Sequence, residues 1–207
     1  ELRSGQFDAA PDFEHWLLKF DGVGKDMELG TGADYSRIEY AYHLMASAAG
    51  IAMKPCRLLE ENGRAHFMTR RFDRDGNRKH HVQSLCAMQH LDYNQRGTHA
   101  YEQLFLVAQQ LGLGDDAHTE IFRRMAFNVM ARNCDDHTKN HAFLLREGGR
   151  WELAPAYDVT HAYNPNGEWT YQHLMGVNGK FDGITRDDLM AVAKRFGVVG
   201  SRDALAR

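Results

Sequence analysis

The sequence has few cysteines, little excess charge and no long apolar run, and each shortage argues against a class of protein. Its three cysteines, Cys56, Cys86 and Cys134, are odd in number and widely spaced, which favours reduced thiols in a cytoplasmic protein over a disulfide framework. No stretch approaches the roughly 18 uninterrupted apolar residues of a membrane span. The first residues show no signal peptide, and the missing initiator methionine suggests a fragment or a processed chain.

The charge balance and the glycines argue against two kinds of ligand site. A net charge of −3 gives no electrostatic case for direct nucleic-acid binding. The glycine-rich stretch 21–34 does not form a P-loop, because Gly24 and Lys25 are followed by Asp26 and no glycine stands five residues earlier. It does not complete a dinucleotide-binding motif either. We interpret this stretch as a flexible connector.

Periodicity and turn residues predict a small mixed part followed by a mostly helical part. Asn62-Gly63 between two apolar runs predicts a hairpin, and Thr185 with Asp188 predicts the start of a helix. The fold class is therefore α+β. The expected elements are a strand at 15–20, a helix at 36–50, a hairpin at 56–72, helices near 98–112 and 118–133, strands at 141–145 and 150–154, and a helix at 185–197.

One apolar stripe in the second of the long helices is expected to lie in the core. Its members recur at helical spacing. They are Phe122, Met125, Ala126, Val129 and Met130.

Three polar residues have the spacing of a phosphoryl-transfer site. Asp135 and Asn140 are five positions apart (140 − 135), and Asp158 follows 18 positions later (158 − 140). The strand–turn–strand expected between Asn140 and Asp158 returns the chain, so these two side chains can lie side by side. In protein kinases this pattern provides a catalytic base and two oxygen ligands for Mg²⁺. We therefore expect Asp135 to accept a proton, and Asn140 and Asp158 to bind Mg²⁺.

A kinase also needs a lysine for the ATP phosphates and an acid that holds this lysine. Lys19 lies on an expected strand and Glu39 on the next expected helix. This is the order of elements that a protein kinase uses for the pair.

Less specific interpretations of the same residues exist. Polar clusters commonly end helices as solvated loops, and we expect Asp136 to be such an exposed neighbour. An acid at a helix C-terminus is poorly placed for the helix dipole, however, which favours a functional role for Asp135. A metal-dependent phosphohydrolase built on Asp135, Asp136, His137 and His141 is a further alternative, although a loop leading into a strand cannot point all four side chains at one ion.

The sequence resembles the HipA-like serine/threonine kinases, which are toxins of bacterial toxin–antitoxin modules. The resemblance rests on "RMAFNVMARNCDDHTKNHAFLL" and "WELAPAYDVTHAY", and extends to "WLLKF", "IEYAYHLMASAAGI" and "MTRRFDR". The family places a glycine-rich loop with an autophosphorylated serine before its lysine strand, and no such loop precedes Lys19 here.

The resemblance implies a protein-kinase-like two-lobed fold and a set of ligand-binding residues. Residues 1–72 would form part of a small α/β N-lobe, and residues 73–207 a mostly helical C-lobe. Asp135 would be the catalytic base, and Asn140 and Asp158 the Mg²⁺ ligands. The residues implied in ATP binding are Lys19, Glu39, Arg70, Arg71, Phe72, His137, Thr138, Lys139, Asn140, Tyr157 and Asp158.

The resemblance also implies partners. A protein substrate would carry the accepting hydroxyl, as family members phosphorylate aminoacyl-tRNA synthetases, and a helix-turn-helix antitoxin would bind the kinase. A catalytically silent kinase-like module that only binds such an antitoxin is the alternative of a different class.

Overall fold

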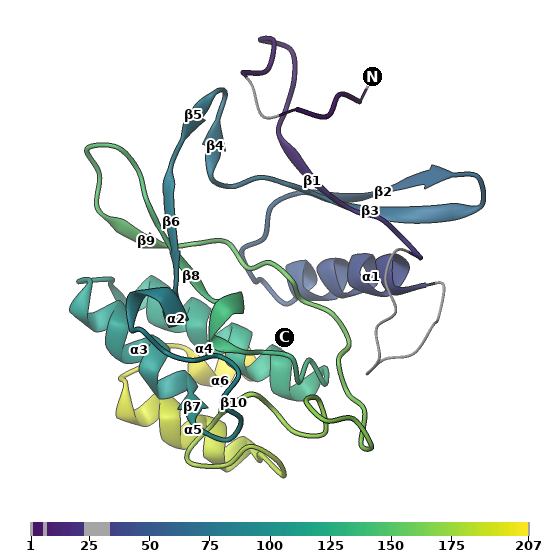
Figure 1. Ribbon diagram of the computed structural model, residues 1–207. Helices are drawn as coiled ribbons and strands as arrows, with labels where there is room; N and C mark the ends of the chain where they lie inside the picture. The colour runs from purple at the N-terminus through teal and green to yellow at the C-terminus, as the bar shows by residue number, and fades with distance from the viewer. Residues whose placement is uncertain (1, 6–7, 23–33, 207) are drawn as a thin grey trace.

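The computed structural model describes residues 2–5, 8–22 and 34–206. The chain forms a mixed α/β structure in which a three-stranded sheet and one helix stand beside a larger, mostly helical part (Figure 1). The stretch 23–33, which the sequence suggests is a flexible connector, lies outside the described residues.

The first sheet is antiparallel and carries the lysine strand at one edge. Its strands are β1 (Trp16–Lys19), β2 (Cys56–Glu61) and β3 (Arg64–Arg70), in the order β1-β3-β2. Asn62 and Gly63 join β2 to β3 with φ values of 49° and 77°, the left-handed pair that a tight two-residue hairpin requires. The predicted hairpin is confirmed.

Helix α1 (Tyr35–Ala48) packs on this sheet. It ends where predicted, because Gly50 has a positive φ of 80° and donates its N–H to the carbonyl of Ser47, a common way to close a helix. Asp34 occupies the N-cap position but makes no capping hydrogen bond through its side chain.

The helical part begins after the first sheet, across short strands β4 (Arg74–Asp75), β5 (Arg78–Lys79) and β6 (His81–Ser84). Its core lies between α3 (Tyr101–Gln110), α4 (Asp115–Met130) and α5 (Arg186–Arg195), with Leu104, Phe122 and Val192 fully buried. Shorter elements complete it: α2 (Leu85–Met88), β7 (His99–Ala100), β10 (Met175–Gly176) and α6 (Ser201–Ala206).

A second three-stranded sheet, β6-β8-β9, supports the loops that carry the polar motif. Strands β8 (Ala142–Leu145) and β9 (Trp151–Leu153) are antiparallel, with Phe143 opposite Leu153, as predicted. Because this hairpin reverses the chain, the residues before β8 and after β9 lie at the same end of it.

The end of α4 corrects one sequence-based expectation. Phe122, Met125 and Ala126 are buried, and Val129 packs against the core, but Met130 is 68% exposed. Met130 is the last residue of the helix, and it continues the apolar spacing beyond the point where the rest of the core covers the helix. The expectation of a buried Met130 was therefore wrong.

A small apolar cluster joins the two parts of the molecule. Ala46 of α1 and Ile51 pack with Ala156 and Val159, which flank the Tyr157-Asp158 pair, and Phe127 of α4 covers them. The segment that carries Asp158 is therefore held between α1 and α4.

Candidate active site

The motif 133–140 begins where α4 ends. Arg132 leaves the helix with a φ of 56°, and the following residues have no regular secondary structure as far as a 3₁₀ turn at Thr138–Asn140. Hydrogen bonds to distant segments replace a regular ladder. Asn133 donates its side-chain amide to Asn128 at 3.0 Å, and the N–H of Cys134 donates to the carbonyl of Ala162 at 2.9 Å.

The two adjacent acids differ in burial. Asp136 is 1% exposed and accepts hydrogen bonds from Tyr101 and His173 at 2.8 and 3.0 Å. The side chain of Asp135 is 46% exposed and lies 3.7 Å from Nε2 of His137. The expectation that Asp136 is exposed to solvent was therefore wrong, because donors from α3 and from residues 173–175 compensate its charge.

Asn140 connects the end of the motif to its beginning. Its Nδ2 donates to the backbone carbonyl of Asp135 at 3.0 Å. Because the amide nitrogen is used in this bond, the amide oxygen Oδ1 is left to accept a hydrogen bond or bind a cation.

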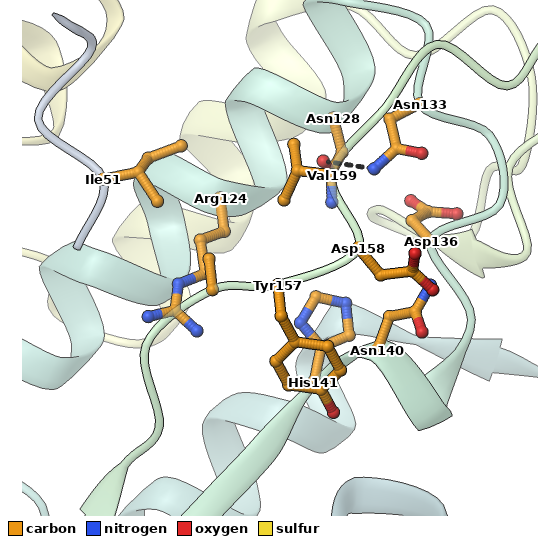
Figure 2. Close-up of a pocket in the computed structure, with 11 residues that line it drawn as sticks. Ile51, Arg124, Asn128, Asn133, Asp136, Asn140, His141, Tyr157, Asp158 and Val159 are labelled. Atoms are coloured by element: carbon orange, nitrogen blue, oxygen red, sulfur yellow. Dashed lines mark hydrogen bonds between the residues drawn. The ribbon is translucent and has the colours of Figure 1, made fainter. Parts of the chain in front are cut away.

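Asp158 lies beside Asn140, as the returning hairpin predicts. Both residues line one small cavity, and Figure 2 shows them with Asp136 around the same end of it. Tyr157 fixes this arrangement by donating its hydroxyl to the carbonyl of Lys139 at 2.7 Å. Asp158 itself has a φ of 57°, a conformation that is rare for residues other than glycine and occurs at functional sites.

Lys19 joins the first sheet to this site. Its ammonium group lies 2.7 Å from Glu39 of α1 and also donates to Asp158. Burial lowers the pKa of Lys19, but the charges of Asp158 and Glu39 outweigh burial and hold the pKa above its ordinary value. Burial raises the pKa of Glu39 more than Lys19 lowers it. The structure thus brings together three predicted residues from β1, α1 and the segment after β9.

His137, Thr138 and Lys139, in the second half of the motif, lie in different surroundings. Thr138 is fully buried, so its hydroxyl is inaccessible in this conformation. Lys139 places its ammonium group 4.5 Å from the centre of the Tyr93 ring, a cation–π contact. The edge of this ring also meets His137 at 5.7 Å between ring centres. Tyr93 could not be identified from the sequence, because no motif or periodicity marks the loop 89–98.

The residues that the resemblance implies at the adenine site divide into two groups. Phe72 lies 5.7 Å from Tyr157 between ring centres and packs on a buried apolar cluster formed by Ala142, Leu144 and Ala154. Arg70 pairs instead with Glu14 at 3.1 Å, and Arg71 makes two hydrogen bonds to Asp73. Both guanidinium groups are therefore engaged by neighbouring acids.

Leu17 is a further candidate that sequence reasoning missed. It stands two residues before Lys19 on β1, so both side chains project from the same face of the sheet. Leu17 is 52% exposed, which leaves an apolar surface beside the lysine. Alternation along the strand could have identified it.

Two further observations concern metals and membranes. Within residues 2–5, 8–22 and 34–206, no group of three or more His, Cys, Asp and Glu side chains has a geometry suited to a metal ion. Over the same residues, none of the helices combines the length and the apolar composition needed to cross a bilayer.

A comparison with models of protein families identifies the family of this chain. A family model described as HipA-like C-terminal domain matches residues 3–207. The HipA toxin of Shewanella oneidensis, solved with HipB and its operator DNA, is similar with a TM-score of 0.67 at 18% identity. The match covers 99% of this chain and 56% of that one, so this chain spans about half the length of that relative.

A second solved structure is similar over a smaller part. The proinflammatory kinase CtkA of Helicobacter pylori matches with a TM-score of 0.51 at 12% identity, covering 70% of this chain and 50% of that one. No curated protein matches the sequence. At these identities the two solved structures establish the similarity of the fold.

Proposed function

The chain belongs to the HipA-like C-terminal domain family, and from this premise we propose that it forms the core of a serine/threonine protein kinase. In this proposal residues 1–72 contribute to a small lobe and residues 73–207 form a mostly helical lobe. Transfer of the γ-phosphoryl group of ATP to a protein hydroxyl takes place between them.

One observation carries this proposal. Lys19 contacts both Glu39 and Asp158, although the three residues come from segments as far as 139 positions apart. A structural ion pair does not require this combination of elements. A kinase does require a strand lysine, a helix glutamate and a metal-binding aspartate at one point.

The donor set fits a magnesium ion. The Asp158 carboxylate and the free Oδ1 of Asn140 are hard oxygen ligands that line the same cavity. Mg²⁺, when bound with ATP, supplies charge neutralisation at the phosphates. On binding of the nucleotide, Lys19 exchanges its contact with Asp158 for a phosphate oxygen and keeps Glu39 as its partner.

Asp135 acts as the catalytic base in this proposal. Its side chain is half exposed, so an acceptor hydroxyl can approach it. As the phosphoryl group moves onto the oxygen of this hydroxyl, Asp135 accepts the proton and ADP becomes the leaving group. Positioning and charge stabilisation account for most of the rate enhancement in such a reaction.

The nucleotide base would lie between Phe72 and the exposed side of Leu17. Phe72 presents apolar surface beside Tyr157, and Leu17 presents it on the strand face that carries Lys19. Arg70 and Arg71 would act from the edge of this site. His137, Lys139 and the backbone of Thr138 would face the phosphates.

Partners follow from the family. The similar HipA toxin was solved with HipB and operator DNA, and we assign a helix-turn-helix antitoxin to this protein by analogy. The substrate would be a protein, with aminoacyl-tRNA synthetases as the first class to test.

A silent binding module remains the second candidate. The direct contact between Lys19 and Asp158 favours it, because this contact places the lysine against the carboxylate that a metal needs.

The test is incorporation of phosphate from γ-labelled ATP with Mg²⁺ by the full-length protein, with Asp135→Asn and Asp158→Asn as controls. Labelling that both substitutions abolish supports the kinase. Nucleotide binding without any self- or partner-phosphorylation supports the silent module.

A further inference from the structure

Asp136, which follows the proposed catalytic base in the sequence, forms a buried ion pair with His173. Both side chains are almost completely buried, at 0% and 8% exposed, and Nδ1 of His173 lies 3.0 Å from Oδ2 of Asp136. Asp136 borders the cavity that Asn140 and Asp158 line, but protein donors engage its carboxylate, and the proposed chemistry assigns no step to either side chain. A buried charged pair of this kind needs another explanation, because desolvation makes it costly as a source of stability.

The carboxylate of Asp136 is the most heavily bonded acceptor at this site. Besides His173, it accepts from the hydroxyl of Tyr101 at 2.8 Å and from the backbone N–H groups of Leu174 and Met175 at 2.9 and 3.2 Å. These donors come from α3 and from β10 with the residue before it. Asp136 therefore fixes its own backbone relative to two elements that are distant in sequence.

His173 also touches the residue on the other side of Asp135. Its Nε2 lies 3.8 Å from Sγ of Cys134, and the N–H of Leu174 donates to the carbonyl of Cys134 at 3.2 Å. The segment 173–175 thus holds both neighbours of Asp135. Because the loop has no regular secondary structure here, these contacts and the bond from Asn140 help to hold Asp135 in place.

We propose that His173 is a positioning residue for the phosphoryl transfer: by holding Asp136 and Cys134, it sets the place of Asp135 relative to the acceptor hydroxyl. This inference rests on the proposed kinase function. The contacts of His173 also connect the chain that follows Asp158 to the loop that carries Asp135. The proposed metal ligands and the proposed base are therefore held relative to one another.

The protonation of His173 agrees with this geometry. Burial lowers its pKa, but the hydrogen bond and charge of Asp136, with a contribution from Cys134, raise the pKa to about 10. The ring is therefore an imidazolium at neutral pH, and both of its nitrogens donate. One cation thus contacts the residues on both sides of Asp135.

The test compares two substitutions of His173 in the full-length protein. His173→Leu removes both donors at similar volume, whereas His173→Asn keeps a donor near the position of Nδ1. A misplacement of about 1 Å in a catalytic group can cost on the order of 100-fold in rate. We therefore expect kcat to fall by about that factor in His173→Leu, and His173→Asn to recover most of this loss.

The readouts separate positioning from a loss of folding. Rates of labelling from γ-labelled ATP, with the protein itself and dephosphorylated casein as acceptors, give kcat and the KM for ATP. We expect that KM to stay within about twofold, because Lys19, Glu39 and Asp158 do not contact His173. A thermal melt confirms that each variant is folded at the assay temperature.

His118→Leu is the matched control. His118 is also a buried histidine, 8% exposed, but it lies on α4 against Phe105, and no hydrogen bond among the described residues joins it to the loop. Its kcat should match the wild type. A folded His173→Leu protein with kcat within threefold of the wild type, or an equal loss in His173→Asn, overturns this inference alone. A wild-type protein that transfers no phosphate overturns the proposed function as well.

Discussion

The pair Lys19–Glu39 allows the proposed active site to be tested through stability before any substrate is known. The perturbation is a double-mutant cycle of Lys19→Met and Glu39→Gln. Lys19→Met leaves the carboxylate of Glu39 buried without its cation, and Glu39→Gln leaves Lys19 with Asp158 alone. The cycle isolates the interaction between Lys19 and Glu39, because Asp158 is present in all four proteins.

The expected coupling energy follows from distance and exposure. Unit charges 2.7 Å apart attract by about 1.5 kcal/mol in bulk water and by about 6 kcal/mol at an effective dielectric constant of about 20. The side chain of Lys19 is 49% exposed and that of Glu39 only 10%, so solvent screens the pair in part. Exposed pairs give about 0.2–1 kcal/mol, and we expect about 1–2 kcal/mol here.

Urea denaturation of the four proteins measures this coupling energy. The control is the same cycle on Arg37 and Glu60, which lie 3.1 Å apart with side chains 47% and 68% exposed, and which should couple by no more than about 0.5 kcal/mol. A coupling below about 0.3 kcal/mol would show that Lys19 and Glu39 do not form the ion pair on which the proposed site depends. In the kinase assay, Glu39→Gln should lower kcat/KM by roughly 5–30-fold, the factor that corresponds to about 1–2 kcal/mol.

Three other measurements test separate parts of the structure. Phe72→Ala should raise the KM for ATP about tenfold with kcat within threefold, because the ring offers binding surface and no chemistry; unchanged KM in steady-state kinetics would remove Phe72 from the nucleotide site. Gly63→Ala should lower the free energy of unfolding in urea by about 1 kcal/mol or more, because Gly63 has a φ of 77°; an equally stable variant would contradict the hairpin geometry. The ordinary pKa of histidine is 6.5 and that of His173 in the folded protein is about 10, so its raised pKa stabilises the fold fully below pH 6.5 and ceases to do so as the pH rises through 10. The difference in unfolding free energy between wild type and His173→Asn should therefore shrink over this range, and a constant difference would show that the charge on His173 has no part in it.

Features that depend on neighbouring residues could be predicted from the sequence. The turn at Asn62-Gly63 and the cap formed by Thr185 and Asp188 are encoded within four residues, and the structure contains both. The encounter of Lys19 with Glu39 was predictable for another reason. A known order of strand and helix assigns each residue to an element, and the elements pack in only a few ways.

Features that depend on distant partners could not be predicted in this way. Asp136 is buried because His173, 37 positions later, and Tyr101, 35 positions earlier, provide donors for it. No local pattern marks these donors, so an acid in a polar loop was assigned to the solvent. Met130 shows the opposite error, since helical spacing continued to the end of α4 although the surface that covers the helix did not.

The distribution of charge explains how four acids can share one site. Lys19 lies against Glu39 and Asp158, and the imidazolium of His173 lies against Asp136, so three carboxylates have a cationic partner within the fold. The side chain of Asp135 is 46% exposed and lies 3.7 Å from Nε2 of His137. Glu39 and Asp136 are buried and Asp158 contacts Lys19, so Asp135 is the acid of this site whose exposure suits the catalytic base that we propose.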